Sequence, residues 1–197
     1  MASQLQRTRP LQTRLAALHQ LPDGFAVIVD PFVTMTNLRF PPEAIDAVTS
    51  VLGTAPPTRP NTCLRGPSGV VVWLGPDEWL VVSAVAAPEP QEAELRAAVT
   101  PFGGAAVDVS GQRVSLTLRG RHVRDVLAKG CALDLHPRVF GPRSSAQTTV
   151  GQAGVVLLAG DDPDEFTVLV RQSFANYLAD WLVDAAEEFR QSPVSTA

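Results

Sequence analysis

Two Asp-Glu pairs carry the residue type that general acid/base catalysis uses. Residues 77–79 read Asp-Glu-Trp, and residues 164–166 read Asp-Glu-Phe. Carboxylate catalysis requires two groups that converge in different environments. Neighbouring residues that enter a strand point to opposite faces, so neither pair converges by itself. We therefore interpret each pair as part of a hairpin turn whose acid accepts backbone N–H bonds, and we expect no catalytic residue in this chain.

A second candidate site lies in residues 129–137, which read Lys-Gly-Cys-Ala-Leu-Asp-Leu-His-Pro. Cys131, Asp134 and His136 could each bind a metal ion, but a fourth ligand is not evident in the sequence. We interpret the segment as a helix exit and turn, with Asp134 or His136 capping the backbone. A contact with a partner and a vestigial ligand pocket remain the alternatives.

Arginine supplies almost all of the positive charge, because Lys129 is the single lysine. Arginine is enriched in protein interfaces. One group of arginines stands at a predicted helix start, where a solvated helix end is the other interpretation, and a second group stands in the N-terminal segment. The candidate partner interface comprises Arg7, Arg9, Arg14, Arg119, Arg121 and Arg124.

Composition and motifs exclude several functions. The 197 residues are 45% hydrophobic and 18% charged with a net charge of −4, which indicates a globular protein and argues against nucleic-acid binding. No glycine-rich nucleotide loop or Gly-x-Ser-x-Gly elbow is present. Cys63 and Cys131 are interpreted as reduced, packed thiols. No apolar run is long enough for a membrane helix or a secretory signal, so we expect a cytoplasmic protein. The missing nucleotide loop and the lack of ligand spacing among the histidines further predict no metal or cofactor on this chain.

The elements that must position these residues occur twice along the chain. Residues 33–38 and 114–118 are alternating strands that precede a helix, and the Asp-Glu turns follow later in each copy. The offset grows from 81 residues (114 − 33) to 87 residues (164 − 77), which fits small loop insertions. Each half therefore reads strand-helix-strand-strand-helix, and the proline-rich residues 54–68 read as a connecting loop.

This order predicts an α+β fold, with one or two antiparallel sheets and helices packed on one face. We expect a basic N-terminal arm over residues 1–21 and a single body over residues 22–190. The body consists of half-units near residues 22–104 and 105–190, and a disordered tail follows over residues 191–197.

Several segments resemble the gamma subunit of heterotetrameric sarcosine oxidase, over roughly residues 20–190. The segment from Lys129 to Pro137 is the most specific of them. More distantly, the body resembles the folate-binding domain of the glycine-cleavage aminomethyltransferases, where a Leu-x-Gly step leads into a helix and a turn with Asp. The further segments that resemble the gamma subunit are residues 74–80, 107–113, 118–120, 124–137, 146–148 and 171–177, with Trp181 and Leu182.

The resemblance implies an accessory subunit, within a complex that oxidatively demethylates sarcosine to glycine and reduces oxygen to hydrogen peroxide. The one-carbon unit passes to tetrahydrofolate, or leaves as formaldehyde. In that family FAD, FMN and NAD sit on the large alpha and beta subunits and zinc on the small delta subunit, so the implied partners are alpha, beta and delta, chiefly alpha.

Two other functions remain open. One is a stand-alone tetrahydrofolate-dependent aminomethyl transferase or folate-binding protein, and the other is a scaffold unrelated to sarcosine. We further expect the basic arm to wrap a partner.

Overall fold

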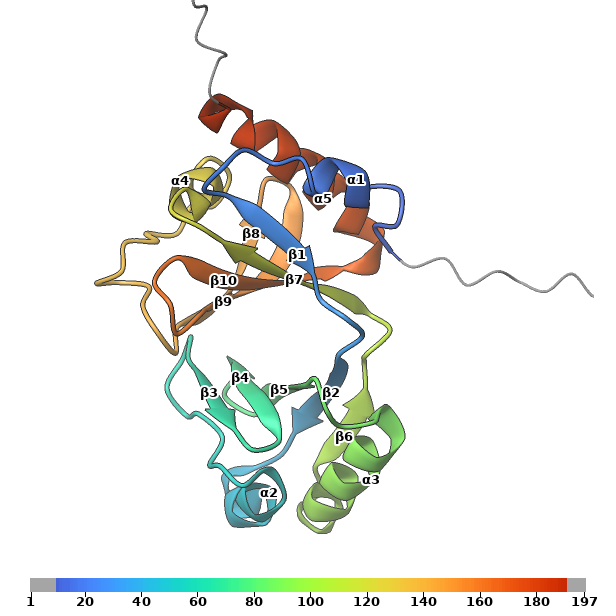
Figure 1. Ribbon diagram of the computed structural model, residues 1–197. Helices are drawn as coiled ribbons and strands as arrows, with labels where there is room; N and C mark the ends of the chain where they lie inside the picture. Colours follow the sequence, from blue (N-terminus) through green and yellow to red (C-terminus); the bar gives the residue numbers. More distant parts are fainter. Residues whose placement is uncertain (1–9, 191–197) are drawn as a thin grey trace, which may run out of the picture.

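Two five-stranded antiparallel sheets lie face to face, and helices cover the outer face of each sheet (Figure 1). This computed structural model describes residues 10–190. The predicted α+β architecture, with antiparallel sheets and helices on one face of each, is confirmed.

The first sheet has the strand order β3-β4-β5-β2-β6. Its strands are β2 (Thr34–Arg39), β3 (Cys63–Gly66), β4 (Gly69–Gly75), β5 (Glu78–Ser83) and β6 (Ala105–Asp108). Its outer face is covered by η1 (Pro42–Ala44), α2 (Ile45–Leu52), α3 (Pro88–Val99) and η2 (Thr100–Phe102).

The second sheet has the order β1-β7-β10-β9-β8. Its strands are β1 (Ala26–Val29), β7 (Arg113–Arg119), β8 (Ser145–Val150), β9 (Ala153–Ala159) and β10 (Glu165–Arg171). Its outer face is covered by α1 (Leu15–Leu18), α4 (Val123–Ala128), α5 (Gln172–Ala186) and η3 (Glu187–Phe189).

The sheets have equivalent strand orders, but each takes its outermost strand from the other sequence half. β1 pairs with β7, and β6 pairs with β2. The connections over residues 30–33 and 109–112 each pass from one sheet to the other. The half-units divided at residues 104 and 105 therefore differ from the sheets by one exchanged strand each.

The proline-rich segment 54–68 contains a strand, contrary to the expected loop. Cys63 to Gly66 form β3, which pairs with β4 from Cys63–Val72 to Gly66–Gly69. The turn between them requires glycine at position 69, because φ is +120° and a Cβ atom there would lie 2.1 Å from the Val82 carbonyl oxygen. Proline at position 67 lies in the turn itself, where no ladder bond is lost.

From Pro10 on, the N-terminal segment packs against the body and does not form a separate arm. Leu11 and Leu18 are buried in the core between the second sheet and its helices. Burial of each leucine is worth about 2 kcal/mol. Arg14 forms an ion pair with Asp180 of α5 at 2.7 Å, which ties α1 to the closing helix.

Candidate functional site

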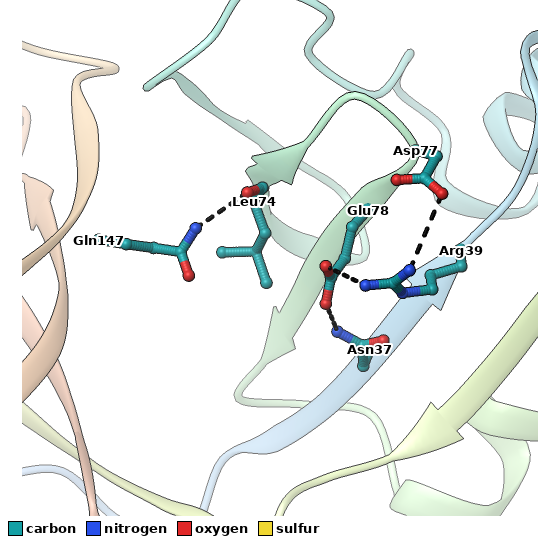
Figure 2. A network of polar contacts seen from close by, with 6 residues as sticks. All are labelled: Asn37, Arg39, Leu74, Asp77, Glu78 and Gln147. Atoms are coloured by element: carbon teal, nitrogen blue, oxygen red, sulfur yellow. Dashed lines mark hydrogen bonds and ion pairs between the residues drawn. The ribbon is translucent and has the colours of Figure 1, made fainter.

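The first Asp-Glu unit is an ion pair between neighbouring strands. Glu78 at the start of β5 lies opposite Arg39 of β2. The Arg39 guanidinium donates to one Glu78 oxygen at 2.6 Å, and the Asn37 amide donates to the other at 2.7 Å (Figure 2). Asp77 lies 3.8 Å from the same guanidinium. Both carboxylates of this unit therefore lie against one arginine.

The second Asp-Glu unit repeats this arrangement in the other sheet. Glu165 at the start of β10 lies opposite Arg119 of β7, with the carboxylate 2.6 Å from Arg119 Nε. The aromatic residue that follows each glutamate is buried on the opposite face, as Trp79 and Phe166. Each unit thus combines a cross-strand ion pair with a buried aromatic anchor.

The expectation that these acids accept backbone N–H bonds is wrong for Asp77 and Glu78. Their carboxylates instead contact the arginine and asparagine side chains of β2. In the second hairpin that role falls to Asp162, whose carboxylate accepts the backbone N–H of Asp164 at 2.8 Å. In the second hairpin Asp162 therefore caps the turn, while Glu165 pairs across the strands with Arg119.

The two sheets are linked where β8 passes β4. The Gln147 amide of β8 donates to the Leu74 carbonyl of β4 at 2.9 Å, close to the Glu78 network (Figure 2). Cys63 N–H donates to the Arg143 carbonyl at 2.8 Å, and Ser145 N–H donates to the Asn61 carbonyl at 3.0 Å. Backbone hydrogen bonds thus join the edge strands β3 and β8 at their first residues.

The Cys131, Asp134 and His136 segment is a turn that caps its own backbone. Asp134 accepts the His136 N–H at 2.9 Å, and His136 Nδ1 accepts the Arg138 N–H at 3.2 Å. Cys131 is buried, with its sulfur 3.9 Å from the Thr148 hydroxyl. The interpretation as a helix exit with backbone caps is confirmed.

Cys63 lies between the sheets, 2% exposed, and burial raises the pKa of its thiol to about 11. At neutral pH it is therefore a protonated, inert thiol rather than a nucleophile. Lys129 is also committed, because its ammonium group donates to the Ala185 carbonyl and lies 2.8 Å from Glu188.

The structure brings Arg119, Arg121 and Arg124 together around the β7–α4 turn but gives each an internal contact. Arg121 Nε lies 3.0 Å from Nε2 of His122. The Arg124 guanidinium donates to the carbonyls of Leu135 and Pro163, the latter at 2.6 Å, and lies 4.8 Å from the centre of the Phe166 ring. Arg14 is paired with Asp180 on α5, and Arg7 and Arg9 lie outside the described residues.

Sequence reasoning missed a second pair of arginines. Arg113 at the start of β7 lies directly opposite Arg171 at the end of β10. Burial lowers the pKa of Arg113, and the neighbouring Arg171 lowers it further, while Glu78 raises it. Each lies six residues along its strand from the Arg119–Glu165 pair, so the register of β7 and β10 is what brings the two arginines together.

A hollow of about 720 Å³ runs beside the edge strand β1. Its walls include α1 and the Arg119–Gly120 turn. Across residues 10–190, no group of three or more His, Cys, Asp or Glu side chains is placed to hold a metal ion. Within the same range, no helix combines the length and the apolar character that a membrane span requires.

Comparison with known proteins supplies the family. Residues 41–188 match the family described as "Sarcosine oxidase, gamma subunit family". The sarcosine oxidase subunit gamma of Corynebacterium sp. (strain P-1) is 36% identical over 169 residues, covering 83% of this chain and 81% of that protein. The Arthrobacter sp. counterpart is 33% identical over 196 residues, covering 96% and 94%.

Two solved structures are also similar. A chain of the heterotetrameric sarcosine oxidase from Corynebacterium sp. U-96, in complex with pyrrole 2-carboxylate, has a TM-score of 0.86 at 29% identity and covers 96% of this chain and 99% of that one. The glycine cleavage aminomethyltransferase T from Bartonella henselae has a TM-score of 0.64 at 17% identity, covering 93% of this chain and 51% of that one. The second likeness is one of fold alone.

Proposed function

The chain belongs to the sarcosine oxidase gamma subunit family, and from this membership we propose that it is an accessory subunit that packs against the large alpha subunit and stabilises the heterotetramer. The complex oxidatively demethylates sarcosine to glycine and reduces oxygen to hydrogen peroxide. The one-carbon unit passes to tetrahydrofolate, or leaves as formaldehyde when folate is absent.

End-to-end similarity to gamma subunits carries this proposal, since 94% of the Arthrobacter protein is covered at 33% identity. The similarity also extends to a chain of the solved heterotetrameric sarcosine oxidase, 99% of which is covered. The candidate catalytic acids also support a structural role, because Glu78 and Glu165 pair with arginines of neighbouring strands.

The proposal assigns FAD, FMN, NAD and tetrahydrofolate to the large partner subunits and zinc to the small delta subunit. Beta and delta complete the assembly. The proposal also retains the cytoplasmic location expected from the sequence. The free thiols of Cys63 and Cys131 support it, because a reducing compartment keeps cysteines unpaired.

A stand-alone folate-dependent transferase is not favoured. The aminomethyltransferase likeness is limited to 17% identity and to 51% of that enzyme, so half of the enzyme has no equivalent in this chain. Three gamma subunits that are 32% to 36% identical cover 83% to 96% of this chain.

The proposed wrapping of a partner by the basic N-terminal segment now concerns Arg7 and Arg9. Removing residues 1–19 would also remove the buried Leu11 and Leu18 and the Arg14–Asp180 ion pair. Removing residues 1–9 spares all three contacts and is the informative deletion. A complex recovered at full yield and activity after this deletion would contradict the wrapping role.

Co-expression with and without this chain tests the function. We expect the tagged chain to copurify with flavin-containing partners, and the other three subunits to lose yield and thermal stability without it. A Glu78→Gln, Glu165→Gln double variant should assemble and keep sarcosine turnover within about twofold of wild type, because both acids form cross-strand ion pairs within this chain. Normal assembly with abolished turnover would show instead that the acids act in catalysis.

A further inference from the structure

One place on the surface combines unpaired positive charge with exposed aromatic rings. Arg113 and Arg171 lie directly opposite in the β7–β10 ladder, so their side chains leave the same face of the sheet. Residues directly opposite in an antiparallel pair have Cβ atoms about 5 Å apart, and like charges there are destabilising. Among residues 10–190, neither guanidinium forms a salt bridge with an acid.

The acid that acts on Arg113, Glu78, already has hydrogen-bond partners of its own. Glu78 raises the pKa of Arg113, but its two carboxylate oxygens accept hydrogen bonds from Asn37 and Arg39. Arg113 is half-buried and Arg171 is exposed, so the pair opens toward the outside at Arg171. An incoming carboxylate could therefore meet both guanidinium groups.

The fold itself does not require this arginine pair. Arg39 and Glu78 in the first sheet correspond to Arg119 and Glu165 in the second. Counting six residues back from Arg39 and six forward from Glu78 reaches Val33 and Ala84, where the second half has the two arginines. One half-unit thus carries an apolar pair where the other carries like charges, which suits an added role better than a structural one.

Exposed aromatic rings stand on α5, which begins directly after Arg171. Gln172 N–H donates to the Gln112 carbonyl at 3.1 Å, which holds the start of α5 beside Arg113. Phe174 in the first turn is 40% exposed, and it meets Tyr177 edge to face with ring centres 6.3 Å apart. The Tyr177 hydroxyl is fixed because it accepts the Gln152 N–H at 3.0 Å.

We propose that Arg113, Arg171, Phe174 and Tyr177 form a docking surface, here called the Arg–aromatic surface, for another subunit of the oxidase that presents an aspartate or glutamate beside apolar side chains. The inference rests on the proposed function as an accessory subunit. Arginine and aromatic side chains are the groups that dominate binding energy at interfaces. A carboxylate is the matching group, because it removes the like-charge repulsion between the arginines.

Charge reversal at position 171 separates docking from folding. In the free chain, Arg171→Glu replaces a repulsive pair with an attractive one opposite Arg113, so its thermal midpoint should be equal to or above that of wild type. In the complex the same change brings an acid against the partner's acid. We expect the variant heterotetramer to dissociate on dilution at least tenfold more readily than wild type, as measured by mass photometry.

Arg138→Glu is the matched control. Arg138 is also exposed, and its replacement by glutamate changes the net charge by the same amount. It should dissociate like wild type. A double-mutant cycle adds the aromatic part: Arg171→Ala and Phe174→Ala should act non-additively on dissociation, whereas Arg138→Ala and Phe174→Ala should be additive. Additivity in both cycles would show that Phe174 is not part of the Arg–aromatic surface.

The outcomes for this surface and for the accessory function differ. Equal dissociation of wild type, Arg171→Glu and Arg138→Glu complexes would overturn the Arg–aromatic surface and leave the accessory function intact. A wild-type chain that does not copurify with the other subunits at all would overturn both proposals.

Discussion

Arg119 of β7 lies directly opposite Glu165 of β10, with the Arg119 Nε atom 2.6 Å from a carboxylate oxygen. Arg39 and Glu78 repeat this relationship between β2 and β5. Each pair stands at the strand end next to the hairpin, and each glutamate precedes a buried aromatic. The duplicated motif therefore fixes strand register twice, once in each sheet.

The two ion pairs should differ in strength. Arg119–Glu165 is a partly exposed pair, with the arginine side chain 55% and the glutamate side chain 25% exposed, so screening by solvent keeps its coupling near 0.5 kcal/mol. Arg39–Glu78 has similar exposure, but Asn37 also donates to Glu78, which orders the carboxylate. Double-mutant cycles in urea denaturation should give the larger coupling for Arg39–Glu78, and the reverse order would contradict this account.

Gly120→Ala should destabilise the protein by about 3 kcal/mol or more. At φ +117°, a Cβ atom at this position would lie 2.3 Å from the Gly24 carbonyl oxygen. This backbone approach lets β1 enter beside the β7–α4 turn, where His122 N–H donates to the same carbonyl at 3.0 Å. The free energy of unfolding of the purified variant measures the effect.

Gly103→Ala is the control for that substitution. Gly103 also has a positive φ, +76°, but a Cβ atom there would meet nothing within 4 Å. Its cost should be limited to the left-handed backbone, about 1 kcal/mol. Equal losses at the two glycines would show that backbone conformation alone, and not the close approach to Gly24, makes position 120 demanding.

Arg124→Ala should lower stability by about 2 kcal/mol, although Arg124 lies near the surface. Its guanidinium joins the turn after α4 to the β9–β10 hairpin through the Leu135 and Pro163 carbonyls, and it covers the Phe166 ring. Lysine lacks the planar fork that reaches two carbonyls, so Arg124→Lys should recover less than half of the loss. Thermal unfolding of the three proteins provides the comparison.

Much of the fold follows from local patterns, and the misses have physical causes. The strands that contain Val71 and Val168 alternate or run apolar between turn residues, and the structure has β4 and β10 there. The sequence did not predict β3 because its four residues lie between prolines. At the edge of the sheet such a short strand forms with little β-propensity of its own. The exchange of β1 and β6 could not be predicted, since strand pairing depends on contacts distant in sequence.

The arginines show the same limit for the site. Spacing placed Arg119, Arg121 and Arg124 together, but only the folded chain reveals that an acid, an imidazole and backbone carbonyls already contact them. Arg113 and Arg171 are 58 residues apart (171 − 113), and only their strand register brings them together. Clustering along the sequence is therefore a weaker guide to free positive charge than register.

The pH dependence of stability should carry the signature of Cys63. In the unfolded chain its thiol ionises near pH 9.0, whereas burial between the sheets raises the pKa to about 11 in the folded protein. Between these values the unfolded state loses a proton that the folded state keeps, so stability is full below pH 9 and falls as pH rises toward 11. The total loss is about 2–3 kcal/mol.

Cys63→Ala isolates this effect, because it removes the thiol while the other titrating groups remain. The variant should be less stable than wild type at pH 8, since a buried side chain is shortened, but its stability should fall less steeply from pH 9 to 11. The free energy of unfolding of each protein, measured by urea denaturation at several pH values from 9 to 11, gives two stability–pH curves. The difference between their slopes measures the linkage. Parallel curves would mean that Cys63 ionises in the folded protein as easily as in the unfolded chain, and that the space between the sheets admits water.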